Sequence, residues 1–239
     1  PTIPWLEPGA TFPPVERAMD AASGMPGLLA AGGQLDVPTL LAAYRQGIFP
    51  WFSEGQPILW WSPDPRLVLI PQDIHISHSL RRVLRRGRFE VRTDSAFADV
   101  LRACAAPRAC STATWITPQM QQAYLRMHEL GYAHSVECWL DGELVGGLYG
   151  MALGQIFFGE SMFSTVRDAS KVALAHLARL LVARGFVLID CQMTTPHLLS
   201  MGAREIPRQL FSQILAAQGV DTPQAQRWPR DAATGLDWH

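Results

Sequence analysis

The chain has 239 residues, of which 48% are hydrophobic and 17% charged, and its formal net charge is -1. This composition supports a sizeable packed core and excludes an intrinsically disordered protein. A net charge so close to zero also excludes binding to nucleic acid or to an anionic membrane through the overall field of the protein, so any contact with a polyanion needs a local basic patch.

The first part of the chain is rich in loops, because proline and glycine interrupt it repeatedly. The pattern predicts one helix there, over residues 36–46, with Asp36 as its N-cap and Gly47 after its end. An aromatic-rich segment follows at residues 48–61. We therefore expect a small, loop-rich α/β domain over residues 1–65.

From residue 66 onward the hydrophobic pattern is regular and predicts a second domain over residues 66–239. The Asp141-Gly142 pair is a strong signal for a two-residue hairpin turn. The predicted strands cover residues 67–70, 89–93, 134–140, 143–153, 155–158 and 186–192, and the predicted helices cover residues 77–86, 95–104, 117–131 and 169–184. Antiparallel hairpins followed by a long helix and a further strand predict an α+β fold.

Metal binding and membrane insertion have no signal in the sequence. The four cysteines and seven histidines lack the spacing of metal ligands, so we expect no metal site. No apolar run is long enough to cross a membrane, and the first residues lack the charged and apolar regions of a secretion signal. We expect a cytoplasmic protein.

Asp190 and Gln192 are the first candidate pair for chemistry. They lie at the end of the apolar strand predicted over residues 186–192, where the period of two places both on one face and Ile189 on the other. A carboxylate there either caps the next turn or faces a cleft. An amide on the same face favours the cleft, because the two groups together could hold one amine.

Glu160 is the second candidate, because it stands between Gly159 and Ser161, directly after the predicted strand 155–158. It either caps the strand end or belongs to a site. The segment resembles half of a nucleophile elbow, but that motif needs glycine where Phe163 stands. We therefore reject a serine hydrolase.

A basic run and several loop tryptophans point to nucleic acid. Residues 77–88 form a predicted amphipathic helix and its end, without an acidic residue among the arginines. Such a face is either simply solvated or contacts phosphates. Tryptophans in loops, Trp51 and Trp115 among them, either pack between domains or stack on unpaired bases. The arginines of the basic run are Arg81, Arg82, Arg85, Arg86 and Arg88.

Taken together, these segments resemble one family, the bacterial leucyl/phenylalanyl-tRNA–protein transferases. The resemblance runs in order from about residue 24 to residue 215 and includes Gly159-Glu160-Ser161-Met162-Phe163-Ser164 and Leu188-Ile189-Asp190-Cys191-Gln192. The other matching segments are residues 27–33, 43–52, 57–66, 115–117, 128–137, 146–150, 169–171 and 202–208.

The resemblance implies a small N-terminal domain followed in the chain by an acetyltransferase-like (GNAT) mixed-sheet domain that works without acetyl-CoA. It implies transfer of Leu or Phe, and less readily Met, from Leu-tRNA or Phe-tRNA to a protein that begins with Arg or Lys. The new peptide bond marks that protein for degradation through the N-degron pathway. An aminoacyl ester is already activated, so no ATP, covalent intermediate or other cofactor is expected.

The resemblance also implies roles for individual residues. Gln192 would contact the attacking amine, Asp190 would polarise Gln192 or take up the proton, and Glu160 would hold the basic acceptor. Two routes for the proton stay open, one through Gln192 and one through the tRNA ribose. The arginines of residues 81–88 would contact the acceptor stem. The residues expected around the aminoacyl-adenosine are Tyr44, Trp51, Trp115, Tyr124, Leu148, Phe157, Met162, Leu174, Leu177 and Ile189.

The sequence departs from the family pattern in three places. Residues 109–114 lack the expected Glu-Gly-Thr form, Leu148 stands where Met is common, and residues 218–239 match nothing in the pattern. The first two could change the amino-acid preference, and none removes a catalytic group.

Two other functions remain as alternatives. An acyl-CoA-dependent acetyltransferase needs a glycine-rich pyrophosphate loop, and residues 164–171 contain no glycine. A non-catalytic module that binds tRNA or N-degrons would leave Asp190, Gln192 and Glu160 without a role.

Overall fold

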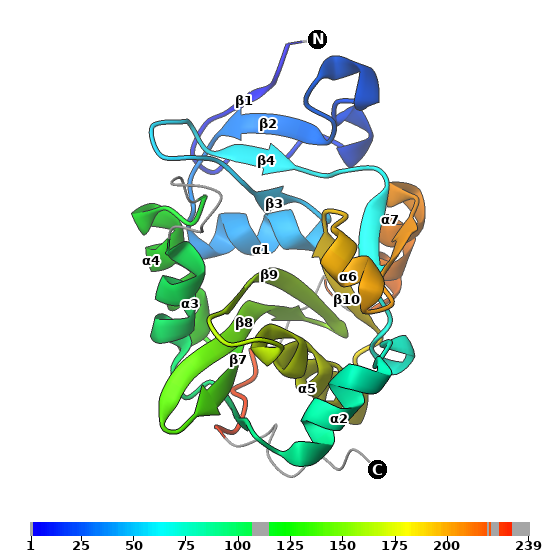
Figure 1. The fold of residues 1–239 in the computed structure, drawn as a ribbon. Coiled ribbons are helices and arrows are strands. Elements are labelled where there is room, and N and C mark those ends of the chain that lie inside the picture. Colours follow the sequence, from blue (N-terminus) through cyan, green and yellow to red (C-terminus); the bar gives the residue numbers. More distant parts are fainter. Residues whose placement is uncertain (1, 107–114, 219, 221–224, 231–239) are drawn as a thin grey trace.

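The computed structural model describes residues 2–106, 115–218, 220 and 225–230, and their strands form two sheets (Figure 1). The smaller sheet has the order β1-β2-β4-β3. Its strands are β1 (Trp5–Leu6), β2 (Leu28–Gly32), β3 (Phe49–Pro50) and β4 (Leu59–Trp61). It lies beside helix α1 (Val37–Arg45), whose first turn is capped by the Asp36 carboxylate as the sequence predicts.

The larger sheet has seven strands in the order β11-β5-β10-β9-β8-β7-β6. All neighbours are antiparallel except β9 and β10, which are parallel. This mixed sheet with its helices confirms the predicted α+β class. The strands are β5 (Arg66–Leu69), β6 (Glu90–Thr93), β7 (Ala133–Leu140), β8 (Glu143–Leu153), β9 (Ile156–Ser164), β10 (Leu188–Gln192) and β11 (Arg204–Ile206).

Helices cover both faces of this sheet (Figure 1). Successive residues of one strand belong to different cores, since Ile156 lies in the buried cluster that contains Leu40 while Phe157 lies in the one that contains Leu174. The remaining helices are α2 (His78–Arg86), α3 (Phe97–Ala105), α4 (Pro118–Glu129), α5 (Ala169–Ala183), α6 (Pro196–Ser200) and α7 (Arg208–Ala217), with short 3-10 helices at Val15–Arg17, Ala21–Ser23 and Pro71–Asp73.

One core crosses from the smaller sheet to the larger one. Leu29 and Trp60 of the smaller sheet belong to the same buried cluster as Phe158 of the larger. The smaller sheet ends at Trp61 and the larger begins at Arg66. The domain boundary at residue 65 stays a prediction.

The strand expected over residues 155–158 is longer than predicted. β9 continues to Ser164, because β8 pairs with it along its whole length and supplies partners as far as Gly146. Glu160 therefore stands inside a strand and not after its end. A bulge lies in β9 at Glu160, because Tyr149 pairs with Ser161 and the next residue, Gly150, pairs with Gly159. A Cβ atom on Gly150 would come within 2.2 Å of the Phe158 carbonyl oxygen.

The parallel strands β9 and β10 pair over three residues and then separate. Their last paired residues are Phe158 and Asp190. Beyond that point β9 stays with β8, whereas β10 stays with β5. The opening between the two strands creates a place for side chains to line a cavity at the middle of the sheet.

Part of the C-terminal segment packs on the fold. Trp228 is buried, and its ring stacks on His134 with 4.2 Å between ring centroids. Gln226 N–H donates to the Gly131 carbonyl and Thr93 N–H to the Arg230 carbonyl. Among the described residues, no helix is both long and apolar enough to cross a membrane.

Candidate active site

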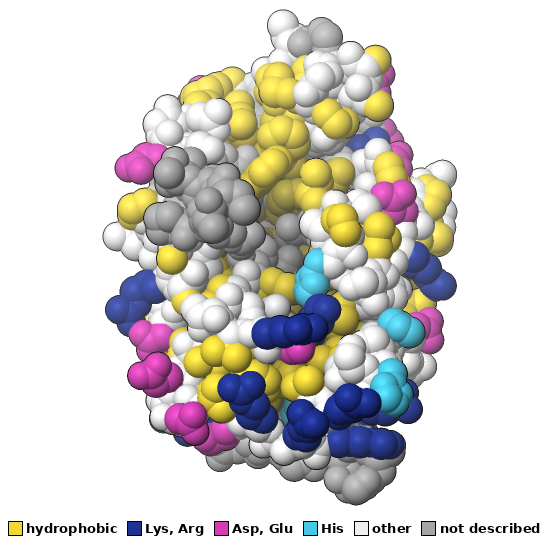
Figure 2. Space-filling view, viewed as in Figure 1, with side chains coloured by type: hydrophobic (Ala, Val, Ile, Leu, Met, Phe, Trp, Pro, Cys, Tyr) yellow, Lys and Arg dark blue, Asp and Glu magenta, His cyan; other side chains and the backbone are white. Residues whose placement is uncertain are grey.

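A cavity of about 850 Å³ opens where β9 and β10 separate. Figure 2 shows it as a hollow in the middle of one face, with hydrophobic side chains along its wall. Eight of the ten residues expected around an aminoacyl-adenosine line it, namely Trp51, Trp115, Leu148, Phe157, Met162, Leu174, Leu177 and Ile189. The cavity brings side chains from β8, β9, β10 and α5 together with aromatic residues from two loops.

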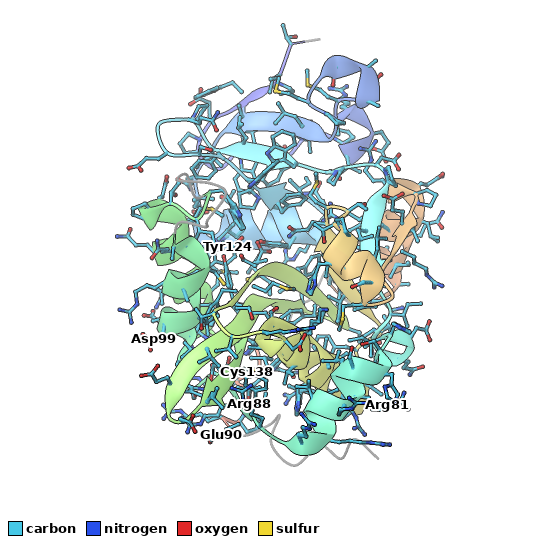
Figure 3. The ribbon with its side chains drawn as sticks, in the orientation of Figure 1. Arg81, Arg88, Glu90, Asp99, Tyr124 and Cys138 are labelled. Carbon is cyan, nitrogen blue, oxygen red and sulfur yellow. The ribbon has the colours of Figure 1, made fainter. Side chains whose placement is uncertain are left out.

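Tyr44 and Tyr124, the other two expected residues, are not among the lining residues and bind Glu160 instead. Tyr44 donates to Glu160 Oε1 at 2.5 Å and Tyr124 to Oε2 at 2.9 Å, and the two hydroxyl oxygens are 2.5 Å apart. Tyr124 reaches the carboxylate from α4 (Figure 3), and Tyr44 reaches it from α1. The tyrosines fix the position of Glu160 in the cavity wall.

Glu160 is a buried carboxylate with an unusual pKa. Burial raises that pKa to about 7, although the hydrogen bonds from Tyr44, Tyr124 and Gln192 lower it. Burial and the neighbouring Glu160 raise the pKa of both tyrosines well above 10.0. Glu160 therefore changes its charge near neutral pH, while the tyrosines remain hydrogen-bond donors.

This pKa makes stability depend on pH. An exposed glutamate in the unfolded chain has a pKa near 4.5, so the folded protein binds the proton more tightly. Stability should then fall as pH rises from about 4.5 to about 7 and level off above. Against a Glu160→Gln variant, we expect wild type to lose up to about 3 kcal/mol between pH 4.5 and pH 8 in urea unfolding. Equal pH profiles for the two proteins would contradict this.

Asp190 lies behind the cavity and forms a buried ion pair. Its carboxylate accepts from Arg66 Nε at 2.8 Å and from Nη2 at 2.7 Å, and neither side chain is more than 1% exposed. The Arg66 guanidinium also donates to the Gly47 carbonyl and lies between the rings of Phe49 and Phe211. Arg66 is the site residue that sequence reasoning missed, and its position at the start of a buried strand was the available signal.

Gln192 does not share a face with Asp190 in the way the period of two predicts. A bulge lies between them, since Asp190 pairs with Val68 and Gln192 with Leu67. Gln192 has a φ of +61°, and its backbone N–H donates to Asp190 Oδ1 at 3.0 Å. The side chain turns into the cavity, where its amide nitrogen donates to Glu160 Oε1 at 3.3 Å.

The opposite orientation of Ile189 and Asp190 is confirmed. Ile189 lines the cavity, and Asp190 is fully buried on the other side of β10. The bulge then allows Gln192 to join Ile189 at the cavity wall. An apolar pocket wall and a buried ion pair can therefore occupy the same short strand.

The aromatic rim is built by two loops, one in the N-terminal part of the chain and one before α4. Trp51 is 39% exposed and packs edge-on against Trp61, whose indole N–H donates to the Trp51 carbonyl at 2.7 Å. Trp115 lines the cavity and lies in the loop that precedes α4. Residues 109–114, which depart from the family pattern, lie outside the described residues.

The five arginines of the basic run are all exposed on α2 and just after it. Ser77 caps this helix and Gly87 ends it in the left-handed conformation, as predicted. Arg81 and Arg88 lie on the outside of the molecule, away from Tyr124 (Figure 3). None of these arginines lines the cavity.

The arrangement suits one kind of chemistry. The apolar walls accept an apolar group, the ionised form of Glu160 attracts a cation, and the rigid Gln192 can orient an amine through its side-chain carbonyl. No group of three His, Cys, Asp or Glu side chains within the described part of the chain could hold a metal ion. Burial raises the pKa of the Cys191 thiol, which makes it a poor nucleophile.

Comparison with known proteins gives the same family over nearly the whole chain. Residues 68–216 match the family model described as leucyl/phenylalanyl-tRNA protein transferase, and residues 33–64 match the model for its N-terminal domain. A leucyl/phenylalanyl-tRNA–protein transferase of Azoarcus sp. is 65% identical over 237 residues, which cover 99% of this chain and 100% of the relative. One from Aromatoleum aromaticum is 63% identical over 234 residues and covers 98% of both chains.

Solved structures align less closely. A GCN5-related N-acetyltransferase from Kribbella flavida aligns with a TM-score of 0.37 and 13% identity, over 68% of this chain and 58% of that one. This alignment says nothing about activity.

Proposed function

This chain belongs to the leucyl/phenylalanyl-tRNA–protein transferase family and is an aminoacyltransferase that acts from tRNA onto proteins, and we propose the following substrates and catalytic residues for it. The donors are Leu-tRNA and Phe-tRNA, with Met-tRNA used less readily. The acceptors are proteins whose first residue is Arg or Lys, and the product is an N-degron. The reaction takes place in the cytoplasm. One observation carries the proposal: Glu160 and Gln192 are hydrogen-bonded to each other on the wall of an apolar cavity.

The donor fits the apolar part of the cavity. Leu148, Phe157, Leu174 and Ile189 provide walls without charge, and Met162 adds a flexible thioether that can adjust to different apolar side chains. Trp51 and Trp115 line the same cavity, and their indole rings would stack on the terminal adenosine. An acidic amino acid such as Asp would lose its hydration against these walls without a partner.

The acceptor fits the polar wall. An Arg or Lys side chain brings a positive charge that favours the ionised form of Glu160, which neighbours Gln192 at 3.3 Å. Tyr44 and Tyr124 keep the carboxylate in one position while it binds. A neutral or acidic first residue lacks this partner.

Peptide-bond formation then needs orientation more than new reagents. The neutral α-amine attacks the ester carbonyl carbon, a C–N bond forms, the C–O bond to the ribose breaks, and the amine proton ends on the ribose oxygen. The Gln192 side-chain carbonyl accepts a hydrogen bond from the amine and aligns it. Asp190 acts as a positioning residue, because Arg66 and the Gln192 backbone N–H occupy its carboxylate.

A panel of donors and acceptors tests this proposal. Rates of transfer from Leu-, Phe-, Met- and Asp-tRNA are measured onto peptides that differ only in the first residue: Arg, Lys, Ala or Glu. We expect Leu and Phe above Met, no transfer of Asp, and Arg and Lys preferred over Ala by at least about tenfold in kcat/KM.

Glu160→Gln is the matched variant for the acceptor panel. It should remove most of the preference for Arg and Lys while the order of donors stays the same, because the donor walls are untouched. Equal transfer onto all four peptides by wild type would overturn the proposed acceptors. Efficient transfer of Asp would overturn the proposed donor pocket.

The arginines of residues 81–88 give a separate prediction about tRNA. We propose that they bind acceptor-stem phosphates without reading the sequence. Replacing Arg81 and Arg85 with Met should weaken tRNA binding and reduce the slope of log K against log salt concentration by about one for each phosphate that is no longer bound. Arg17→Met, which removes an exposed cation from the N-terminal part, is the control and should leave the slope unchanged. A slope equal to that of wild type in the double variant would show that these arginines do not bind the tRNA phosphates.

A further inference from the structure

One part of the cavity wall has polar side chains that the proposed chemistry does not use. It is formed by the end of β9, the connection to α5, the first turn of α5 and helix α6. Its polar lining residues are Ser164, Thr165, Ser170, Thr195 and His197. The amino acid, the acceptor amine and the adenine ring are already accommodated by other walls, so this part is available for another group of the substrate.

His197 is the least satisfied group in this wall. Its imidazole ring lines the cavity, and its Nε2 atom is buried without a hydrogen-bond partner. Burial and, secondly, the charge of Lys171 lower the pKa of His197 below 6.5, so the ring is neutral at pH 7. A buried nitrogen without a partner costs free energy, which an oxygen ligand would recover.

Lys171 supplies the charge next to His197. It is the only lysine of the chain, it lies in the first turn of α5, and no ion pair with a described residue involves it. Asp168, the acidic residue before the helix, is 3.7 Å from Arg167 instead. Among the described residues that line the cavity, Glu160 is the only acidic one, and it is held by Tyr44, Tyr124 and Gln192.

The position of Lys171 connects the cavity to the basic surface of α2. Helix α2 packs on α5 through Leu80 and Leu84. Figure 2 shows Lys and Arg side chains gathered over α2 and near the start of α5, below the hollow. A polyanion bound along α2 therefore meets the first turn of α5 before it reaches the cavity.

We propose that Lys171 and His197, with the Ser170 hydroxyl, bind the phosphodiester on the 5′ side of the terminal adenosine of the donor. The inference rests on the proposed function, because it needs an aminoacyl-adenosine in the cavity. In that position the ribose carries the amino acid on one side and the phosphate on the other. Lys171 contributes the charge, and the His197 ring and the hydroxyl contribute hydrogen bonds to phosphate oxygens.

Two small donors separate this phosphate from the rest of the tRNA. They are 3′-O-phenylalanyl-adenosine and the same ester of adenosine 5′-monophosphate. We expect wild type to prefer the phosphorylated donor by about tenfold in kcat/KM, the size of one charge-assisted contact. Lys171→Met should reduce this ratio to near one and His197→Leu should reduce it in part, while transfer from phenylalanyl-adenosine stays at the wild-type rate and reports that the variants are folded.

The control is Arg167→Met, which removes a neighbouring cation whose side chain is 93% exposed and does not line the cavity. It should keep the wild-type ratio. If Arg167→Met and Lys171→Met lower the ratio equally, the preference reflects general electrostatic attraction, and the proposed phosphate site is overturned.

The remaining outcomes are also decisive. A wild-type ratio near one overturns the phosphate site and leaves the proposed function standing, provided that Leu-tRNA is still used. No transfer from any donor, Leu-tRNA included, overturns the proposed function itself. If Lys171→Met does not fold, calorimetry on wild type decides: adenosine 5′-monophosphate must bind about tenfold more tightly than adenosine, and equal affinities overturn the inference.

Discussion

Replacing Gln192 with alanine is expected to lower kcat for transfer by about 10²- to 10⁴-fold, the range found when a group that orients or exchanges a proton is removed. Gln192 is the amide whose side chain enters the cavity beside Glu160, while its backbone is held by Asp190. The KM for aminoacyl-tRNA should change little, because the donor walls remain. The measurement is single-turnover transfer of labelled leucine onto an Arg peptide.

The backbone of Gln192 supplies a control for folding. Its φ of +61° is left-handed, a conformation that glycine adopts with less strain than other residues. Gln192→Gly should therefore be as stable as wild type or more stable by about 1 kcal/mol, and as inactive as the alanine variant. If either variant keeps wild-type kcat, Gln192 has no part in the reaction.

Replacing Asp190 with asparagine should reduce stability by about 3 to 5 kcal/mol, because it leaves the Arg66 guanidinium charged, buried and unpaired. Transfer should fall as well, since the loss of the ion pair with Arg66 weakens the hold on the strand end that positions Gln192. Urea unfolding gives the first effect and the transfer assay the second. The surface pair of Arg92 and Glu90 is the reference, and Glu90→Gln should reduce stability far less than Asp190→Asn does.

A double variant separates the two roles of this ion pair. Arg66→Met with Asp190→Leu removes both charges, and stability should recover relative to Asp190→Asn because apolar residues can replace a buried pair. Transfer should not recover, because nothing then holds the Gln192 backbone. Recovery of both would show that Asp190 acts only in stability.

Local sequence signals predicted most of the larger sheet and its helices. Caps such as Ser77 and Thr117 mark helix starts, and the Asp141-Gly142 pair marks a hairpin in which both residues have positive φ. The strands of the smaller sheet were not predicted. They are short and aromatic, and they are strands only because they pair with one another.

The site was predicted in its residues more than in its geometry. The apolar wall follows from the resemblance to the family, and the structure brings its members together around the cavity. The bulge before Gln192, the separation of β9 and β10, and the Arg66 partner of Asp190 depend on contacts between distant segments. No local pattern in the sequence encodes such contacts.

We expect the cavity side chains to promote peptide-bond formation with a donor that is already activated. Intact-mass measurement of an Arg-initiated protein, incubated with the purified chain and Leu-tRNA without ATP or acyl-CoA, tests it directly. We expect a gain of one leucyl residue on the acceptor N-terminus with wild type, and none with Gln192→Ala. An unmodified acceptor in the presence of folded, tRNA-binding wild type would contradict it.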